Sequence, residues 1–447
     1  MQLKTKSNEK DMINNNKKSN KNNKRKMTII FFMSIIFMGI VVVANQLWPV
    51  YEENKKLSFD EMTSQSETCE DGMDITEYDS KNAGYNLPVE DEEQAAAEAD
   101  CIAALDKIHE VYLDYYLGDS LDKCQTIDLV YTTDENGNRY VMLTDDIIGE
   151  MVEVLGKEGV PVSRSDRLMQ SMPNYEKMHQ FLLQSSHGKQ GEVVLYEICE
   201  SGGLNRKKFS FDGEEMYVLN CAGTWNYEGR SSISRITYNR IEEWEYTEKG
   251  WFCYTVCVPE PGEGQAEVNG NSVLRIKPVN QEYQEFCEKW LLPIGYQRNN
   301  LFSEEWDAEQ MENLKYNELY EYFYVMKYGK SFDSKQFSEG IPKEEFEALM
   351  ISYLPVSKKQ LQTYAVYDSD SETYVCIQEE CRDYAVDGFG TSIPEITDIC
   401  EQADGTIIVT ADVVCGMAGE DAVYTHEVIL KFMEDGNVMY LGNHLRK

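Results

Sequence analysis

GTIIVTADVVC (405–415), AVYTHEVILKFM (422–433) and VMYLGNHL (438–445) follow one another near the end of the chain. Each stretch is rich in β-branched, leucine or aromatic residues, and polar residues separate them, which is typical of consecutive β-strands. Asp435 and Gly436 lie between the last two stretches, and these residue types accept the positive φ angles of a tight turn. The pattern predicts a three-stranded antiparallel meander.

Helical spacing precedes this meander, in residues 317–329 and 341–354. In the second of these segments the apolar side chains on one face are Phe346, Leu349, Met350 and Tyr353. Such steps of three and four residues are typical of an amphipathic helix. Because helices followed by strands are typical of α+β domains, we predict one such domain over residues 298–447.

The same order, helix first and strands after, is predicted for residues 89–297. An apolar stripe through Cys101, Leu105 and Ile108 predicts a helix from about residue 91 to 118. Further helices are expected at 145–156 and 174–186, and at 281–292. A hairpin and five strands are expected at 127–144, 192–199, 214–221, 235–246, 251–258 and 272–279. The predicted fold class is therefore α+β, with two domains built on antiparallel meander sheets.

The charge of the chain is divided sharply. Residues 1–26 carry nine basic and two acidic residues, a net charge of +7, whereas the other 421 carry 33 basic and 77 acidic residues, a net charge of −44. Residues 27–44 are uncharged and apolar, and 18 helical residues span roughly 27 Å, close to the thickness of the bilayer core. Basic residues beside a membrane span are held in the cytoplasm.

These observations predict a basic cytoplasmic tail at 1–26, a transmembrane helix at 27–49 and an acidic flexible stalk at 50–88. The two domains would then lie outside the cell. A cleaved secretory signal is the alternative, since Val42 and Ala44 are small enough for a cleavage site. The expected location is the cell membrane, with the N-terminus cytoplasmic and the bulk of the chain extracellular.

The acidic body argues against nucleic acid as a partner, because phosphate contacts need lysine and arginine. The sequence contains none of the motifs GxxxxGK[ST], GxGxxG, HExxH, GxSxG and CxxC. Ser186 and Lys189 have the SxxK spacing of serine acyl-enzymes, but the companion SDN and KTG motifs are absent. The residues therefore point to no catalytic centre and no organic cofactor.

One acidic loop is a candidate calcium site. Positions 1, 3, 5 and 12 of a calcium-loop register are occupied by Asp368, Asp370, Glu372 and Glu379. However, Thr373 stands where the sharp turn of such a loop needs glycine. The alternative is a solvated turn that leads into a strand.

The chain has twelve cysteines, an even number that permits disulfides outside the cell. Cys253 and Cys257 fall on one face of a predicted strand, about 13 Å apart. This separation is too long for a disulfide between them. Disulfides with other strands and buried free thiols both remain open.

The segment YNELYEYFYVMKYGKSFDSKQFSEGIPKEEFEALMISYLPVSKKQLQTYAVYDSDSETYV, with the closing meander, resembles an uncharacterised family of membrane-anchored surface proteins of Gram-positive gut anaerobes. The layout of the chain also resembles conjugation-channel proteins with paired NTF2-like domains. This second resemblance implies an NTF2-like or cystatin-like fold for the second domain.

We therefore expect a single-pass membrane protein whose extracellular domains bind a protein or glycan partner, or act as an assembly scaffold. This expectation leans towards a protein that is not an enzyme. One alternative is an extracellular hydrolase of glycan or cell wall, which needs a pair of Asp or Glu residues that leaves no sequence signature. A component of a conjugation or secretion channel is the other alternative.

Overall fold

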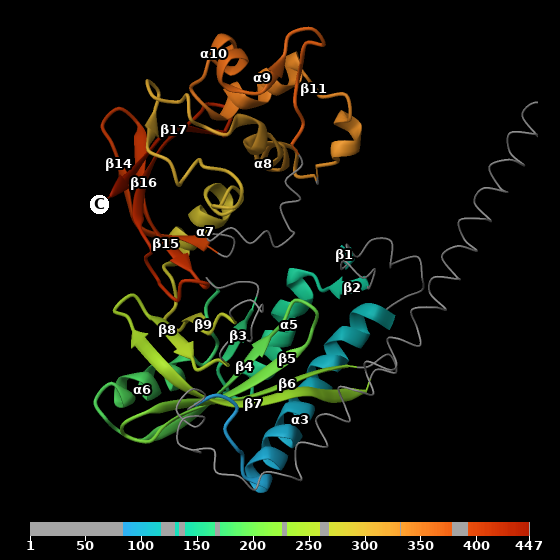
Figure 1. Ribbon diagram of the computed structural model, residues 1–447, viewed down its shortest axis with the longest axis vertical. Coiled ribbons are helices and arrows are strands. Elements are labelled where there is room, and N and C mark those ends of the chain that lie inside the picture. Colours follow the sequence, from blue (N-terminus) through green and yellow to red (C-terminus); the bar gives the residue numbers. More distant parts are fainter. Residues whose placement is uncertain are drawn as a thin grey trace, which may run out of the picture. The chain divides into compact units, whose positions relative to one another are not determined.

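The computed structural model describes residues 84–117, 130–133, 139–165, 170–225, 230–259, 268–330, 332–377 and 392–446. These residues belong to one compact unit that contains two large β-sheets, each with its own helices (Figure 1).

The first sheet has seven strands in the order β3-β4-β5-β6-β7-β8-β9. Their bounds are β3 Val162–Arg164, β4 Gly191–Ile198, β5 Leu204–Phe211, β6 Met216–Trp225, β7 Ser231–Tyr246, β8 Trp251–Val256 and β9 Asn271–Arg275. Neighbouring strands are antiparallel except β3 and β4, which are parallel. A separate hairpin joins β1 (Val130–Thr133) to β2 (Arg139–Met142), as the sequence predicts.

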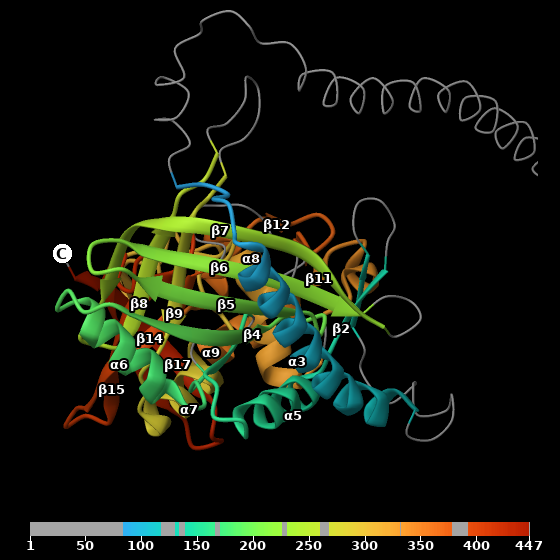
Figure 2. The same cartoon turned by 90° about the horizontal axis from the view of Figure 1, so that it is seen from below.

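Helices cover both faces of this sheet. One face packs against α3 (Asp91–Leu117), which contacts β5, β6 and β7, and against α5 (Asp145–Gly156) (Figure 2). Helix α3 buries the predicted stripe of Cys101, Leu105 and Ile108 there. The opposite face packs against α6 (Tyr175–Ser185) through Phe209 and Phe252. Alternating strand residues thus serve two separate cores, because successive side chains point to opposite faces.

The second sheet has five strands in the order β10-β17-β16-β15-β14. Their bounds are β10 Trp306–Asp307, β14 Ser392–Glu401, β15 Thr406–Cys415, β16 Thr425–Phe432 and β17 Val438–Arg446. Strands β15 to β17 are the three expected consecutive strands, and they pair antiparallel.

The helices of the second core are α7 (Gln281–Trp290), α8 (Tyr316–Tyr328) and α9 (Lys343–Tyr353). Aromatic rings join α8 to α9: Phe323 stacks on Tyr353 at 4.6 Å, and Tyr320 stacks on Phe346 at 5.2 Å between ring centroids. The remaining elements are the 3₁₀-helix η1 Ser334–Phe337, the short helix α10 Lys358–Tyr364 and the small sheet of β11 Ile341–Pro342, β12 Tyr367–Asp368 and β13 Thr373–Tyr374. Dense aromatic packing of this kind adds to the stability gained from area burial.

The predicted fold class needs correction. Within the described ranges, no helix has both the length and the apolar character needed to cross a bilayer, and the predicted transmembrane helix at 27–49 lies outside those ranges. The seven-stranded sheet is also not an antiparallel meander, since β3 runs parallel to β4. The described chain is a mixed α+β fold whose larger sheet has seven strands. The predicted domain boundary at residue 298 stays a prediction.

Candidate functional site

The edge of the seven-stranded sheet is partly open. Edge strand β3 pairs with Tyr196, Glu197 and Ile198, which form the last part of β4. Among the strands that the structure describes, none pairs with residues 191–195 of β4 on this side. Within the described part of the chain, these five residues of sheet edge, which span roughly 13 Å, therefore have no neighbouring strand.

Pro161 explains why β3 does not extend along β4. The backbone N–H of Tyr196 donates to the carbonyl oxygen of Pro161 at 3.0 Å. In the same parallel register, the next bond would join the carbonyl of Val194 to the N–H of residue 161. Proline has no N–H to donate. The ladder must end at this point.

The hydrogen bonds of β4 alternate between its two sides, and this alternation identifies which of its backbone groups face the open edge. The N–H of Tyr196 and the carbonyl of Ile198 both face β3, because they bond to Pro161 and Ser165. Residues two apart in a strand direct their N–H and C=O to the same side. Glu192 and Val194 therefore present two donors and two acceptors to the open edge, whereas Val193 bonds to β5.

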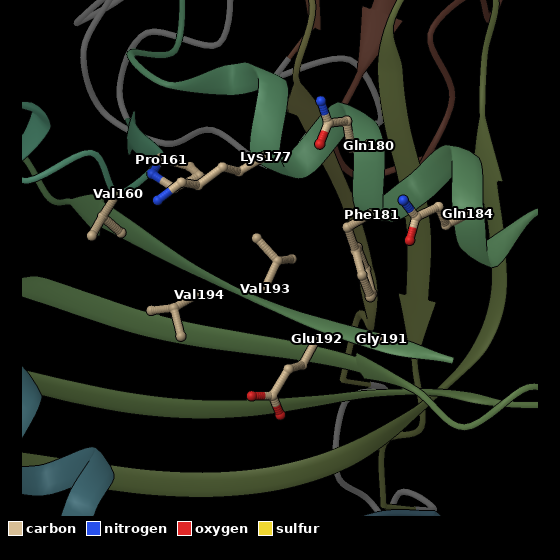
Figure 3. A pocket seen from close by; sticks show the side chains of 10 residues that line it. All are labelled: Val160, Pro161, Lys177, Gln180, Phe181, Gln184, Gly191, Glu192, Val193 and Val194. Carbon is tan, nitrogen blue, oxygen red and sulfur yellow. The ribbon is translucent and has the colours of Figure 1, made fainter. Parts of the chain in front are cut away.

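Helix α6 lies over this edge and turns it into a groove (Figure 3). The groove has a volume of about 390 Å³. Val193 points into it from the strand, and the Phe181 ring descends from α6 toward Gly191, while Glu192 points away from α6. Val160, Pro161 and Val194 add apolar surface, and the polar lining residues are Lys177, Gln180 and Gln184. The groove thus combines an apolar floor with unpaired backbone.

Asn174 fixes the position of α6 at one end of the groove. Its side-chain amide donates to the carbonyl of Gly156 at 2.7 Å and to the carbonyl of Val160 at 2.9 Å. These bonds tie the start of α6 to the segment that leads into β3. These two partly buried hydrogen bonds therefore help to set the width of the groove at this end.

Among the described residues that line the groove, Lys177 alone is basic. Figure 3 shows its side chain running from α6 toward Pro161. The side chain is exposed, and within the described residues it forms no ion pair. An uncompensated ammonium group therefore stands at the end of the groove that Pro161 closes.

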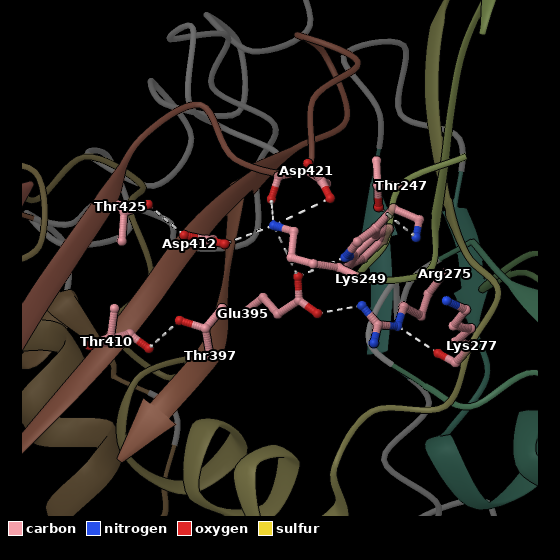
Figure 4. Close-up of polar contacts among 11 residues, drawn as sticks. Thr247, Lys249, Arg275, Lys277, Glu395, Thr397, Thr410, Asp412, Asp421 and Thr425 are labelled. Carbon is pink, nitrogen blue, oxygen red and sulfur yellow. Dashed lines mark hydrogen bonds and ion pairs between the residues drawn. The ribbon is translucent and has the colours of Figure 1, made fainter. Parts of the chain in front are cut away.

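A second group of charged residues joins the two sheets (Figure 4). Lys249, in the turn between β7 and β8, contacts Asp412 at 2.8 Å, Asp421 at 3.3 Å and Glu395 at 3.6 Å. Burial alone lowers the pKa of Lys249, but these carboxylates raise it above its usual value. The lysine is therefore held in its charged form.

Both carboxylate oxygens of Glu395 accept hydrogen bonds. One accepts a bond from the guanidinium of Arg275, and the other accepts from the indole N–H of Trp251 at 2.7 Å. Glu395 and Arg275 are 4% and 7% exposed. The oxygens of Asp412 are taken by Lys249 and Thr425. Because each carboxylate has partners within the cluster, we interpret the cluster as a structural link between the sheets.

The predicted calcium residues lie partly on one exposed turn. Asp368 ends β12, and its carboxylate accepts from the N–H of Asp370 and from the Ser371 hydroxyl, both at 2.9 Å. Glu372 has a positive φ of 53° and pairs with Lys343 at 3.2 Å. Glu379 lies outside the described residues. In the described ranges no cluster of His, Cys, Asp and Glu fits a metal ion; the calcium site stays a prediction.

Nine cysteines fall within the described ranges, and no disulfide joins any two of these nine. Cys101, Cys221, Cys253, Cys257, Cys287 and Cys415 are buried, whereas Cys400 is exposed. A buried thiol behaves as a small apolar side chain. Cys69, Cys124 and Cys381 lie outside the described residues, so disulfides and buried thiols both stay predictions for the chain.

The sequence contains signals for the parts of the groove but not for the groove itself. The helix at 174–186 and the strand at 192–199 are predicted, and the structure confirms both as α6 and β4. Pro161 indicates that a ladder is interrupted near this point. Which strand lies at the sheet edge depends on pairing between distant segments, and no local pattern gives it.

These features define a class of protein: a two-sheet α+β fold whose candidate site is a groove at an open sheet edge. Residues 94–447 match the model of a family of unknown function (DUF6070), and the chain belongs to this family. The predicted membership of an uncharacterised family is thereby confirmed. No curated protein matches the chain.

Proposed function

We propose that this protein is a binding module that takes up an extended peptide segment of a partner as an added strand beside β4. The observation that carries the proposal is the open edge at Glu192 and Val194, which lies under α6. Strand addition uses backbone hydrogen bonds for affinity and side-chain pockets for specificity. The groove supplies both, because Phe181 and Val193 line it beside the unpaired backbone.

The affinity expected for strand addition at this edge is moderate. Glu192 and Val194 together offer four backbone hydrogen bonds, and each contributes about 1 kcal/mol net. An apolar side chain seated against Val193 and Phe181 adds about 1.5–3 kcal/mol. Association and ordering of the peptide offset part of this gain. We expect dissociation constants in the micromolar range or weaker for a short peptide, and tighter binding for a partner with further contacts.

The experiment uses a fluorescein-labelled hexapeptide of alternating threonine and valine, with binding followed by fluorescence anisotropy. The informative variant is Glu192→Pro, which removes the N–H at the open edge. The bonds from β4 to β5 are kept, because residue 192 takes no part in them. The expected result is an affinity at least about tenfold lower, since one bond is lost and the proline ring obstructs the incoming strand.

The matched control is Glu192→Ala, which removes the side chain and its ion pair with Lys208 but keeps the N–H. This variant should bind the peptide nearly as well as the unchanged protein. A second control is the same peptide with alternate amides methylated, which should not bind. Equal affinity of the proline and alanine variants, or no binding of the hexapeptide at all, would contradict strand addition.

The resemblance to surface proteins of Gram-positive gut anaerobes adds a location to this proposal, with the acidic body outside the cell. The partner would then be a protein exposed at the surface. Protease added to intact cells should degrade the body of the chain. Complete protection on intact cells, with digestion after lysis, would argue for a different location.

A further inference from the structure

The groove is not symmetric along its length, and its two ends differ in access and in charge. An incoming strand would lie in line with β3, which begins at Val162. Pro161 and Val160 therefore block the path of the incoming strand at one end of the groove. At the other end, beside Gly191, this path is open. A continuous chain must turn aside at the blocked end, but a chain terminus can stop there.

The charge at the blocked end selects which terminus fits. Lys177 directs its side chain toward Pro161 (Figure 3), and its Nζ lies close to Gly159. No ion pair within the described residues neutralises this ammonium group. A free amino terminus would be repelled by it, whereas a C-terminal carboxylate would be attracted.

The direction of the peptide follows from these two facts. Helix α6 begins near Val160 and ends near Gly191, so that Lys177 stands beside the C-terminal half of β4. A peptide whose last residue stops beside Pro161 must run parallel to β4. This is also the direction of β3 relative to β4. The last residues of the peptide would then lie in line with β3, beside the part of β4 along which β3 does not extend.

From this geometry we infer that the ligand is the free C-terminal tail of a partner, bound parallel to β4 with its terminal carboxylate beside Lys177. This inference rests on the proposed function and specifies its ligand. The net charge of −37 repels strongly acidic segments at long range. The favoured tail therefore carries apolar residues and a single terminal carboxylate, and not an acidic run.

The test compares two forms of the alternating threonine–valine hexapeptide, one with a free C-terminal carboxylate and one with a C-terminal amide. Both carry fluorescein at the N-terminus. With the unchanged protein at low salt, the free acid should bind about three- to fivefold more tightly, the range of an exposed ion pair. The preference should fall at high salt, because salt screens exposed charges.

Lys177→Met should abolish the preference without abolishing binding. The matched control is Lys189→Met, since Lys189 is also exposed but lies outside the lining of the groove; this variant should keep the preference. Equal binding of acid and amide by the unchanged protein would overturn the inference while leaving strand addition intact. A preference that survives in Lys177→Met would also overturn it. Failure of both peptides to bind would overturn the proposed function as well.

Discussion

His426 makes the stability of the second sheet depend on pH in a way that can be calculated. This residue lies on β16 and is fully buried. Its Nδ1 is 2.6 Å from the side-chain oxygen of Asn443, and its Nε2 is 2.7 Å from the hydroxyl of Tyr296. The Asn443 amide nitrogen already donates to the carbonyls of Phe302 and Glu304. Nδ1 must therefore carry the proton, and Nε2 accepts from Tyr296.

Burial lowers the pKa of His426 from 6.5 to about 4, and the bond to Asn443 offsets only part of this effect. Between these two values the unfolded chain binds a proton that the folded protein does not. Stability is therefore lost as the pH falls from 6.5 to 4. The lowering of the pKa of His426 from 6.5 to about 4 corresponds to about 3 kcal/mol of stability.

The perturbation that isolates this effect is His426→Gln, which removes the titrating ring. Urea unfolding of both proteins at pH 7 and pH 4.5 gives the difference in their free energies of unfolding. The variant should be the less stable protein at pH 7, and this difference should shrink by about 2–3 kcal/mol at pH 4.5. Carboxylates titrate in both proteins, so their effect cancels in the comparison. A difference that does not change with pH would refute the reasoning.

Further predictions concern the link between the sheets, the thiols and the calcium loop. Glu395→Gln leaves the buried Arg275 without a carboxylate and should lower the free energy of unfolding by about 3 kcal/mol; a loss under about 1 kcal/mol in urea unfolding would contradict the structural role of the cluster. Iodoacetamide should label Cys400 in the native protein, while Cys287, whose pKa burial raises to about 12, should react only after unfolding; mass spectrometry that finds native labelling of Cys287 would contradict its burial. If the calcium loop binds calcium, added calcium should raise the melting temperature of the protein, and Asp368→Asn should abolish this rise. A melting temperature that calcium leaves unchanged would argue against the site.

Local patterns predict the elements of this fold well where the burial of an element is regular along its sequence. Helices α5 and α6 match their expected bounds within about a residue, because apolar periodicity and acidic first turns define them. The sequence pattern does not predict strand β5, which contains Arg206, Lys207 and Lys208 in succession. The structure pairs Lys207 with Glu197 at 2.9 Å and Arg206 with Asp100 at 2.5 Å. The local sequence pattern of β5 cannot predict these ion-pair partners, because they lie on other elements of the fold.

Strand β14 shows the same limit. Pro394 and Glu395 interrupt its apolar pattern, yet Glu395 is buried because Arg275 and Trp251 reach it from the other sheet. The candidate groove was missed for a related reason. Its opening depends on the order of strands in the sheet and on where β3 stops, and neither follows from the residues of β4 alone.

Amide hydrogen exchange at single-residue resolution tests the open edge of β4 most directly. The amides of Glu192 and Val194 should exchange rapidly in the free protein, because they face solvent, while that of Val193 should be protected by its bond to β5. Saturation with the threonine–valine hexapeptide should slow exchange at Glu192 and Val194 without changing it at Val193. Slow exchange at Glu192 and Val194 in the free protein would show that another group already occupies the edge, and would contradict the account.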